Sequence, residues 1–269
     1  MYIATLKDLG GTFMRYVDLN SDIGEGFGNY DTGLDEEIIT CISSANIACG
    51  FHAGDPVIMD RTVSKCVVAN VSIGAHPGYP DLAGFGRRNM EMSEEEITSC
   101  IKYQLGALIA YGKTYNARVS HLKPHGAMYN MAAVDYKIAK AISMAIYEVD
   151  KEIILVGLAN SQLIKAGKDM GLRVAREIFA DRAYNDNGTL VSRKVEGAVI
   201  SDEGLAMDRL VKMLKTGRVT SINGREVEVE ADTICVHGDN PKAVEFVRQI
   251  RKRLEIEGIA VCPMSEFIK

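Results

Sequence analysis

The chain has 269 residues, of which 47% are hydrophobic and 25% are charged; this composition is typical of globular proteins and excludes a disordered, collagen-like or disulfide-scaffold chain. Its 31 Lys and Arg residues against 36 Asp and Glu residues give a net charge of −5, which offers no general attraction to nucleic acid or anionic lipid. No apolar run reaches the roughly 18 residues of a membrane helix, and the N-terminal residues lack a signal-peptide pattern. We therefore expect a cytoplasmic protein that binds neither nucleic acid nor membrane.

Short apolar runs alternate with helical patterns along the chain, which is the order of repeated βα units around a largely parallel sheet. Helical periodicity is clearest over 94–109 and 242–254, where apolar residues fall on one face. Ser93 and Glu96 form a capping box for the first of these helices, and Asp55 before Pro56 predicts a further helix start. The predicted strands are 15–20, 44–50, 71–76, 118–123, 153–157, 172–180 and 233–237.

Residues 218–230 depart from this alternation. Asn223-Gly224 lies between two segments of alternating pattern, which predicts a hairpin with a type I′ turn. No linker, charge block or internal repeat divides the chain, so we expect one domain. Seven strand and helix units fit a closed α/β barrel, a (β/α)7 relative of the TIM barrel, better than an open sheet.

All five histidines fall at or just beyond the carboxyl end of a predicted strand, the end that carries the active site in parallel α/β folds. His125 lies between Pro124, which ends its strand, and Gly126, which permits close approach, so we expect its side chain to be presented to a ligand. His121 can share a direction with Lys123 but also fits a hydrogen-bonded core histidine. The other three histidines are His52, His76 and His237.

Acidic and amide side chains gather after the first strand. Asp18 and Asn20 share one face of that strand, while Asp22 and Glu25 lie in the glycine-rich segment that follows. Crowded carboxylates suit a cation, a substrate ammonium or amide, or general-base work, because like charges raise at least one pKa. A solvated turn is the alternative. Asn46 adds an amide near the second strand.

Two further sites have competing interpretations. Asp55 fits an N-cap first and a functional carboxylate second. Asp181 and Arg182, after the sixth strand, form either a local ion pair or an anion site at the guanidinium.

Metal and nucleotide sites are weakly indicated. Histidines and carboxylates from different strands can converge on a divalent cation, but no pair has the spacing that places two ligands on one helix, so the metal stays unknown. The six cysteines form no C-x-x-C pair. The phosphate-loop motif is absent, so an ATP site cannot be located from the sequence.

The motifs together resemble the LamB/YcsF family. The resemblance runs in order from about Tyr16 to the C-terminal region, which makes 15–269 a single family domain and 1–14 an N-terminal extension. It rests on DLNSDIGEGFG at 18–28, ANIACGFHAGDP at 45–56, GAHPGYPD at 74–81, KPHGA at 123–127, EIFADRAY at 177–184 and ICVHGD at 234–239.

The resemblance implies a distorted seven-stranded barrel of the glycoside hydrolase/deacetylase type. It also implies one subunit of the ATP-dependent 5-oxoprolinase, which with two partner subunits opens 5-oxo-L-proline to L-glutamate. A metal-dependent amide hydrolase or deacetylase acting alone, and a lactam-binding subunit without chemistry, are the alternatives. Candidate catalytic residues are His125, Lys123, Asp22 and Glu25, and candidate substrate-binding residues are Asp18, Asn20, Asn46, His52, His76, Asp181, Arg182 and His237.

Overall fold

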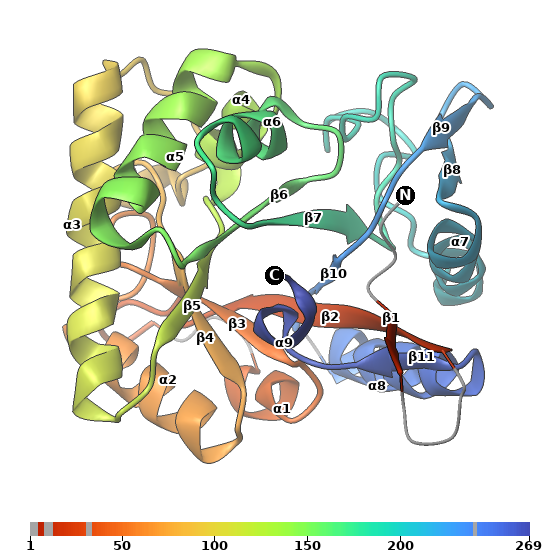
Figure 1. Cartoon of the computed structure of the whole chain (residues 1–269), viewed down its shortest axis with the longest axis horizontal. Coiled ribbons are helices and arrows are strands. Elements are labelled where there is room, and N and C mark those ends of the chain that lie inside the picture. The colour runs from red at the N-terminus through yellow and green to blue at the C-terminus, as the bar shows by residue number, and fades with distance from the viewer. Residues whose placement is uncertain (1–4, 8–12, 31–33, 239–240) are drawn as a thin grey trace.

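A parallel barrel forms the centre of the protein (Figure 1). The computed structural model describes residues 5–7, 13–30, 34–238 and 241–269. Within these residues seven parallel strands pair in the closed order β2, β10, β7, β6, β5, β4, β3 and back to β2. The seven strands are β2 (Phe13–Ile23), β3 (Ser44–Ala48), β4 (Ser72–His76), β5 (Val119–Leu122), β6 (Ile154–Leu158), β7 (Val174–Phe179) and β10 (Thr233–Val236).

These strands confirm the predicted α/β barrel, because each predicted apolar run contains or overlaps one of them. Strands such as β3 and β6 are buried along their whole length, as expected where helices cover the outside of a parallel barrel. The helices are α1 (Asp35–Ile39), α2 (Pro56–Val68), α3 (Glu94–Thr114), α4 (Gly126–Val134), α5 (Tyr136–Asp150), α6 (Gln162–Asp169), α7 (Glu203–Thr216), α8 (Pro241–Ile256) and α9 (Met264–Phe267), with a 3₁₀ turn η1 at Leu82–Gly84.

Local signals determine where two helices begin. The Ser93 and Glu96 capping box is present at α3, and the Asp55 carboxylate accepts the N–H groups of Val57 and Ile58 at 2.8 and 2.9 Å. These contacts confirm both predicted starts.

The predicted hairpin also forms, between β8 (Arg218–Thr220) and β9 (Glu226–Glu228), but its turn differs from the prediction. Gly224 has a φ of 83°, whereas Asn223 is not among the residues with positive φ, so the type I′ turn was wrong. The N–H of Gly224 bonds the carbonyl of Ser221 at 3.0 Å, which gives a three-residue loop ending in a left-handed glycine.

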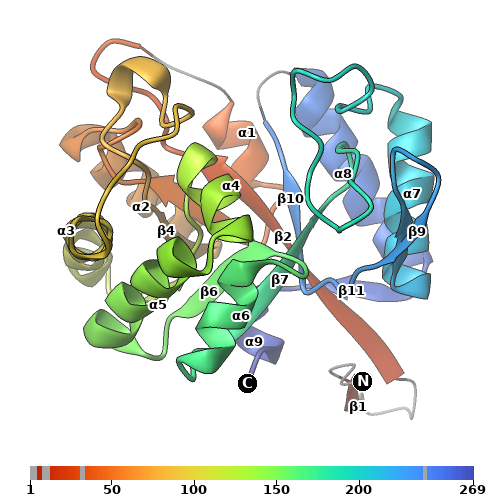
Figure 2. The same cartoon turned by 90° about the horizontal axis from the view of Figure 1, so that it is seen from above.

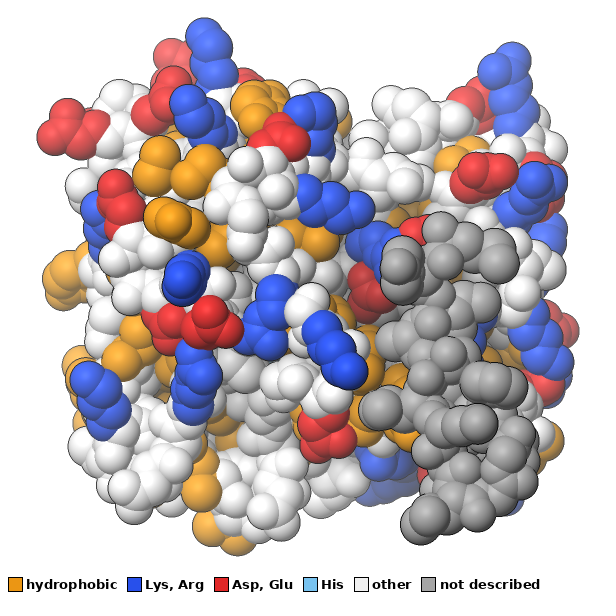
Figure 3. All heavy atoms as spheres, in the orientation of Figure 1, with side chains coloured by type: hydrophobic (Ala, Val, Ile, Leu, Met, Phe, Trp, Pro, Cys, Tyr) orange, Lys and Arg blue, Asp and Glu red, His pale blue; other side chains and the backbone are white. Residues whose placement is uncertain are grey.

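The amino end of the barrel is covered by C-terminal residues. Met264 and Phe267 of α9 pack on Ile154, Val156 and Ala175 of the neighbouring strands. In Figure 1 α9 lies in front of the barrel, and on this face the charged side chains of both signs are mixed (Figure 3). Short strands complete this end: β1 (Thr5–Lys7) pairs antiparallel and β11 (Ile259–Val261) pairs parallel with β2.

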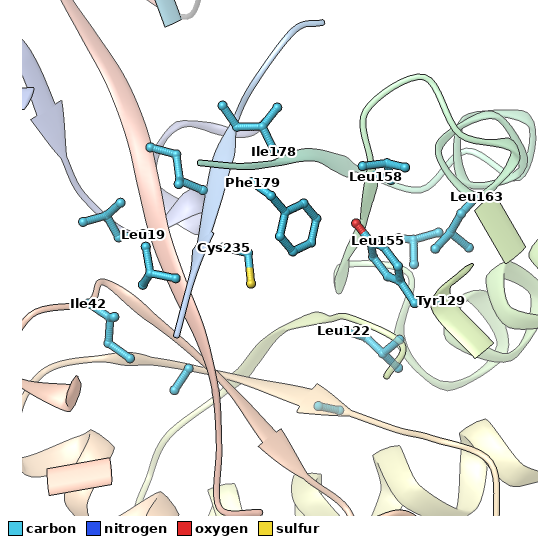
Figure 4. Close-up of a cluster of buried hydrophobic side chains, with 14 of the residues drawn as sticks. Leu19, Ile42, Leu122, Tyr129, Leu155, Leu158, Leu163, Ile178, Phe179 and Cys235 are labelled. Carbon is cyan, nitrogen blue, oxygen red and sulfur yellow. The ribbon is translucent and has the colours of Figure 1, made fainter. Parts of the chain in front are cut away.

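Apolar packing lies mainly between the barrel and its helices. Ile97, Ile101, Leu105 and Leu108 of α3 are all buried, on the face that the periodicity predicted. Figure 4 shows apolar side chains of the strands and of α4 around the barrel interior, among them Phe179 and Tyr129, whose ring centroids are 6.3 Å apart. None of the described helices combines the length and apolarity needed to cross a membrane.

Candidate active site

A cavity of about 620 Å³ opens where the parallel strands end. Its walls come from strand ends, from α4 along its length and from the loop between β7 and α7 (Figure 2). Six of the predicted site residues line it: Asp22, His76, Lys123, His125, Arg182 and His237.

Lys123 occupies the base of this cavity with its ammonium almost fully buried. Its Nζ lies 2.8 Å from Oε1 of Glu177, 3.1 Å from Oδ1 of Asp22 and 3.2 Å from Sγ of Cys235. Burial opposes the charged form, yet Asp22 and the other neighbours hold the pKa of Lys123 well above its usual value. Lys123 is therefore a fixed cation at neutral pH.

Asp22 is the matching anion. Burial alone would raise its pKa, but His76 and Lys123 together hold it well below the usual value. Oδ1 of Asp22 also accepts from Nδ2 of Asn46 at 2.8 Å. This carboxylate consequently stays ionised, held between an ammonium and an imidazole.

A layer of hydrogen-bonded polar side chains supports Lys123 from within the barrel. Nδ2 of Asn20 donates to Glu177 and Thr233, and its Oδ1 accepts from Asn46 at 2.7 Å. Nε2 of His121 lies 2.9 Å from Oδ1 of Asn46, and burial lowers the pKa of His121 to about 3. His121 is thus a neutral core histidine, the second of its two predicted roles.

Asp18 lies deeper still and does not line the cavity. Its carboxylate accepts from the hydroxyls of Ser43, Ser44 and Thr233 at 2.5–2.7 Å, and from the backbone N–H of Met264 in α9. Burial raises the pKa of Asp18 to about 6 despite these donors. The predicted substrate contact at Asp18 has no support from this position, and neither Asn20 nor Asn46 lines the cavity.

Three histidines and Glu25 form a compact cluster at one side of the cavity. The His52 and His125 rings stack at 3.7 Å between centroids, with His76 edge-on to both. Oε1 of Glu25 lies 3.3 Å from Nε2 of His52 and 3.4 Å from Nδ1 of His125. Desolvation, followed by the Asp22 charge, raises the pKa of Glu25.

The outer nitrogens of two rings are committed to backbone carbonyls. Nδ1 of His76 lies 2.7 Å from the Lys123 carbonyl, and Nε2 of His125 lies 2.8 Å from the Phe85 carbonyl. These contacts make Nδ1 of His76 and Nε2 of His125 hydrogen-bond donors. In neutral rings the other two nitrogens, Nε2 of His76 and Nδ1 of His125, are then both acceptors, although they lie only 3.0 Å apart. A proton or a cation between them would remove this conflict. A shared proton would be carried by His76. Burial opposes the charged form of His76, but the Asp22 carboxylate raises the pKa of His76, whereas burial lowers the pKa of His125 to about 3.

A divalent cation is the other solution. One ligand atom from each of Glu25, His52, His76 and His125 lies within 4.8 Å of the other three. Backbone carbonyls behind two of the imidazoles orient these rings in the way that hydrogen-bond acceptors orient metal-bound histidines, and the buried Nδ1 of His52 has no partner among the described residues. The donor set of imidazoles and one carboxylate fits zinc or a similar ion.

Arg182 is buried, and its guanidinium donates to the carbonyls of Val191 and Ala198 in its own loop at 2.7 and 3.4 Å. Among the described residues no ion pair within 4.0 Å joins Arg182 to the half-buried Asp181, so the structure does not form the first of the two alternatives, and the anion site at the guanidinium remains a prediction. Nε2 of His237 is buried without a hydrogen-bond partner among the described residues, and Asp239 lies outside those residues.

Several residues of the site were not predicted. Glu177 and Tyr129, joined by a 2.7 Å hydrogen bond, hold the far side of Lys123, and Cys235 completes its surroundings. Glu177 begins the EIFADRAY motif inside a predicted strand, where inward and outward side chains alternate; that alternation was the available signal. Arg87 and Arg193 come from loops without regular pattern.

Comparisons with known proteins agree with this geometry. Residues 17–269 match the LamB/YcsF family model. The chain is 56% identical over 255 residues to a 5-oxoprolinase subunit of Campylobacter jejuni, covering 95% of this chain and 100% of the relative. It is 54% identical over 252 residues to the corresponding 5-oxoprolinase subunit of Pyrococcus abyssi, covering 94% and 99%. The crystal structure of a lactam utilization protein from Thermus thermophilus has a TM-score of 0.87 and 42% identity, covering 92% of this chain and 99% of that one. The chain therefore belongs to the LamB/YcsF family.

Proposed function

We propose that this chain is one subunit of an ATP-dependent 5-oxoprolinase, which with two partner subunits converts 5-oxo-L-proline to L-glutamate. The supporting observation is that one cavity holds a buried ammonium, an ionised carboxylate and paired imidazoles, in a chain whose relatives are named as 5-oxoprolinase subunits. A five-membered lactam is a resonance-stabilised amide, so its opening is coupled to ATP hydrolysis.

In the proposed reaction the γ-phosphoryl group of ATP passes to the lactam carbonyl oxygen, and water then attacks the activated carbon. The ring C–N bond breaks, the nitrogen takes up a proton, and an acyl phosphate remains. A second water then hydrolyses the acyl phosphate to the carboxylate of glutamate and free phosphate. Negative charge develops on oxygen in these steps, and Lys123 is the fixed cation that stabilises it.

Proton transfer falls to the acids and histidines beside Lys123. Glu25, whose pKa burial raises, accepts the proton of the attacking water better than Asp22, whose pKa is held low. His125 is the first candidate for acid/base work, and His76, with its raised pKa, holds the proton that the pair shares in the free protein.

Alternatively, the cluster of His52, His76, His125 and Glu25 would hold a divalent cation in place of the shared proton, and these side chains would then act as ligands and not in proton transfer. Such an ion supplies Lewis-acid stabilisation of a carbonyl or phosphoryl oxygen when it is bound. The expected signature is metal that remains in the purified chain after dialysis and is lost from the His52→Ala variant, measured by elemental analysis.

The deciding experiment combines the full chain with its two partner subunits and follows glutamate and ADP together. Equal amounts of both products are expected, and glutamate without ADP would contradict the coupling. His125→Asn should lower turnover by about 10²-fold or more. The exposed Arg61→Gln is the matched control, and unchanged turnover in H125N would remove His125 from proton transfer.

One observation favours a second candidate, a metal-dependent amide hydrolase that acts alone: the His/Glu cluster could serve hydrolysis without a nucleotide. Glutamate release from 5-oxoproline by the isolated, metal-loaded chain in the absence of ATP would support this candidate over the first.

A further inference from the structure

The charge of the cavity differs in sign from that of the whole chain. The chain has 31 basic and 36 acidic residues, yet in the described part of the structure five cations and one carboxylate line the cavity. Lys123 and Asp22 pair with each other at the base. The remaining four cations are Arg87, Arg182, Arg193 and Lys194; we call them the basic rim.

No acid pairs with the basic rim within the described residues. None of its four members forms an ion pair within 4.0 Å there, in contrast to surface cations such as Arg225, which pairs with Asp186 at 3.4 Å. Asp186, an acid of the same loop, is held by that pair and by the Ser221 hydroxyl. The positive charge of the rim therefore lines the cavity without a protein counter-ion in contact.

Arg182 makes the rim more than a group of surface charges, because this residue is only 7% exposed and a buried cation is costly unless an anion accompanies it. Its hydrogen bonds to the loop carbonyls of Val191 and Ala198 use two of the five guanidinium N–H donors. The N-terminal residues Gly126 and Ala127 of α4 line the same cavity, and a helix N-terminus adds partial positive charge.

We infer that the basic rim binds the phosphoryl group of a ligand, so that this chain itself, and not only a partner, receives the phosphorylated species. One carboxylate would need one cation, whereas four cations match the multiple charge of a phosphate or polyphosphate. The cavity, at about 620 Å³, is of a size that holds drug-like ligands, which leaves room for a small lactam at Lys123 and a phosphoryl group at the rim together.

This inference rests on the proposed function and deepens it by placing its phosphoryl group. Two sources share the chemistry: the polyphosphate of a nucleotide, and a phosphorylated small molecule represented by inorganic phosphate. Titration calorimetry of the isolated full chain with ATP, pyrophosphate, inorganic phosphate and 5-oxoproline separates them. ATP and pyrophosphate binding above inorganic phosphate indicates the nucleotide, and comparable binding of all three indicates the smaller ligand.

Two variants test the rim. Arg182→Met and the exposed pair Arg193→Gln/Lys194→Gln should each weaken phosphate or ATP binding at least about tenfold, and increasing salt should weaken it in the wild type. Arg61→Gln, which replaces an exposed arginine of α2, should bind as the wild type does. The exposed pair keeps the test valid where Arg182→Met disturbs its loop.

Absence of phosphate, pyrophosphate and ATP binding would overturn the inference, as would equal binding by both rim variants and the wild type. If 5-oxoproline is the only ligand that binds, and the rim variants weaken its binding, the rim is a carboxylate site and the inference is wrong. A reconstituted complex that still makes glutamate and ADP in any of these cases would leave the proposed function intact, so the two failures are distinguishable.

Discussion

Replacing Lys123 by Met would leave two carboxylates in the barrel without their shared cation. Nζ of Lys123 lies 2.8 Å from Glu177 and 3.1 Å from Asp22, with Glu177 fully buried. Removing one partner of such a buried pair costs about 3–5 kcal/mol.

We therefore expect K123M to lose about 3–5 kcal/mol of unfolding free energy at pH 7. The loss follows because Glu177 and Asp22 stay in the barrel while the ammonium that both of them contact is removed. The chain has no tryptophan, so urea unfolding is followed by far-UV circular dichroism.

The double variant Lys123→Met/Glu177→Gln should recover about 2 kcal/mol of this loss, because it removes the uncompensated charge. Lys65→Met, which breaks an exposed pair with Glu36, is the control and should cost less than about 1 kcal/mol. A K123M variant within about 1 kcal/mol of wild type would refute the account of a buried charge network.

Three further outcomes follow from single contacts. Gly74→Ala places a Cβ against the His121 ring, too close for the ring to stay, and should displace it from Asn46 with a loss of about 1–3 kcal/mol; an unchanged melting temperature would contradict this. Because burial raises the pKa of Asp18 to about 6, the folded state holds the proton more tightly than the unfolded chain, and wild type should gain about 2 kcal/mol over Asp18→Asn between pH 7 and pH 4 in denaturant titrations. Asp55→Ala removes an N-cap and should cost about 1 kcal/mol in the same assay, whereas no loss would mean that the cap carries no stability.

Periodicity and position made the barrel predictable. Parallel strands buried on both faces read as short apolar runs, and helix caps such as Ser93 with Glu96 depend only on neighbouring residues. The convergence of His76, Lys123 and His125 followed from one rule, that functional groups gather at the carboxyl ends of parallel strands.

The sequence did not indicate which polar residues face the cavity and which support them from below, because this depends on how deep each residue lies along the barrel axis. Asp18 and Asp22 lie on the same strand four residues apart, yet one bonds hydroxyls beneath the site and the other faces the cavity. Loop cations such as Arg193 were missed for a different reason: nothing in a local pattern indicates which wall an irregular loop will form.

The closure of the barrel by C-terminal residues has a consequence for biosynthesis. β10 separates β2 from β7, and α9 supplies the N–H that reaches Asp18, so the barrel ring and its base both require segments that follow the other six strands in the chain. Fragments that end before β10 hold strands with unpaired edges and cannot assemble the Lys123 environment, since Cys235 lies in β10. The nascent chain thus acquires its chemistry only after β10 has been synthesised.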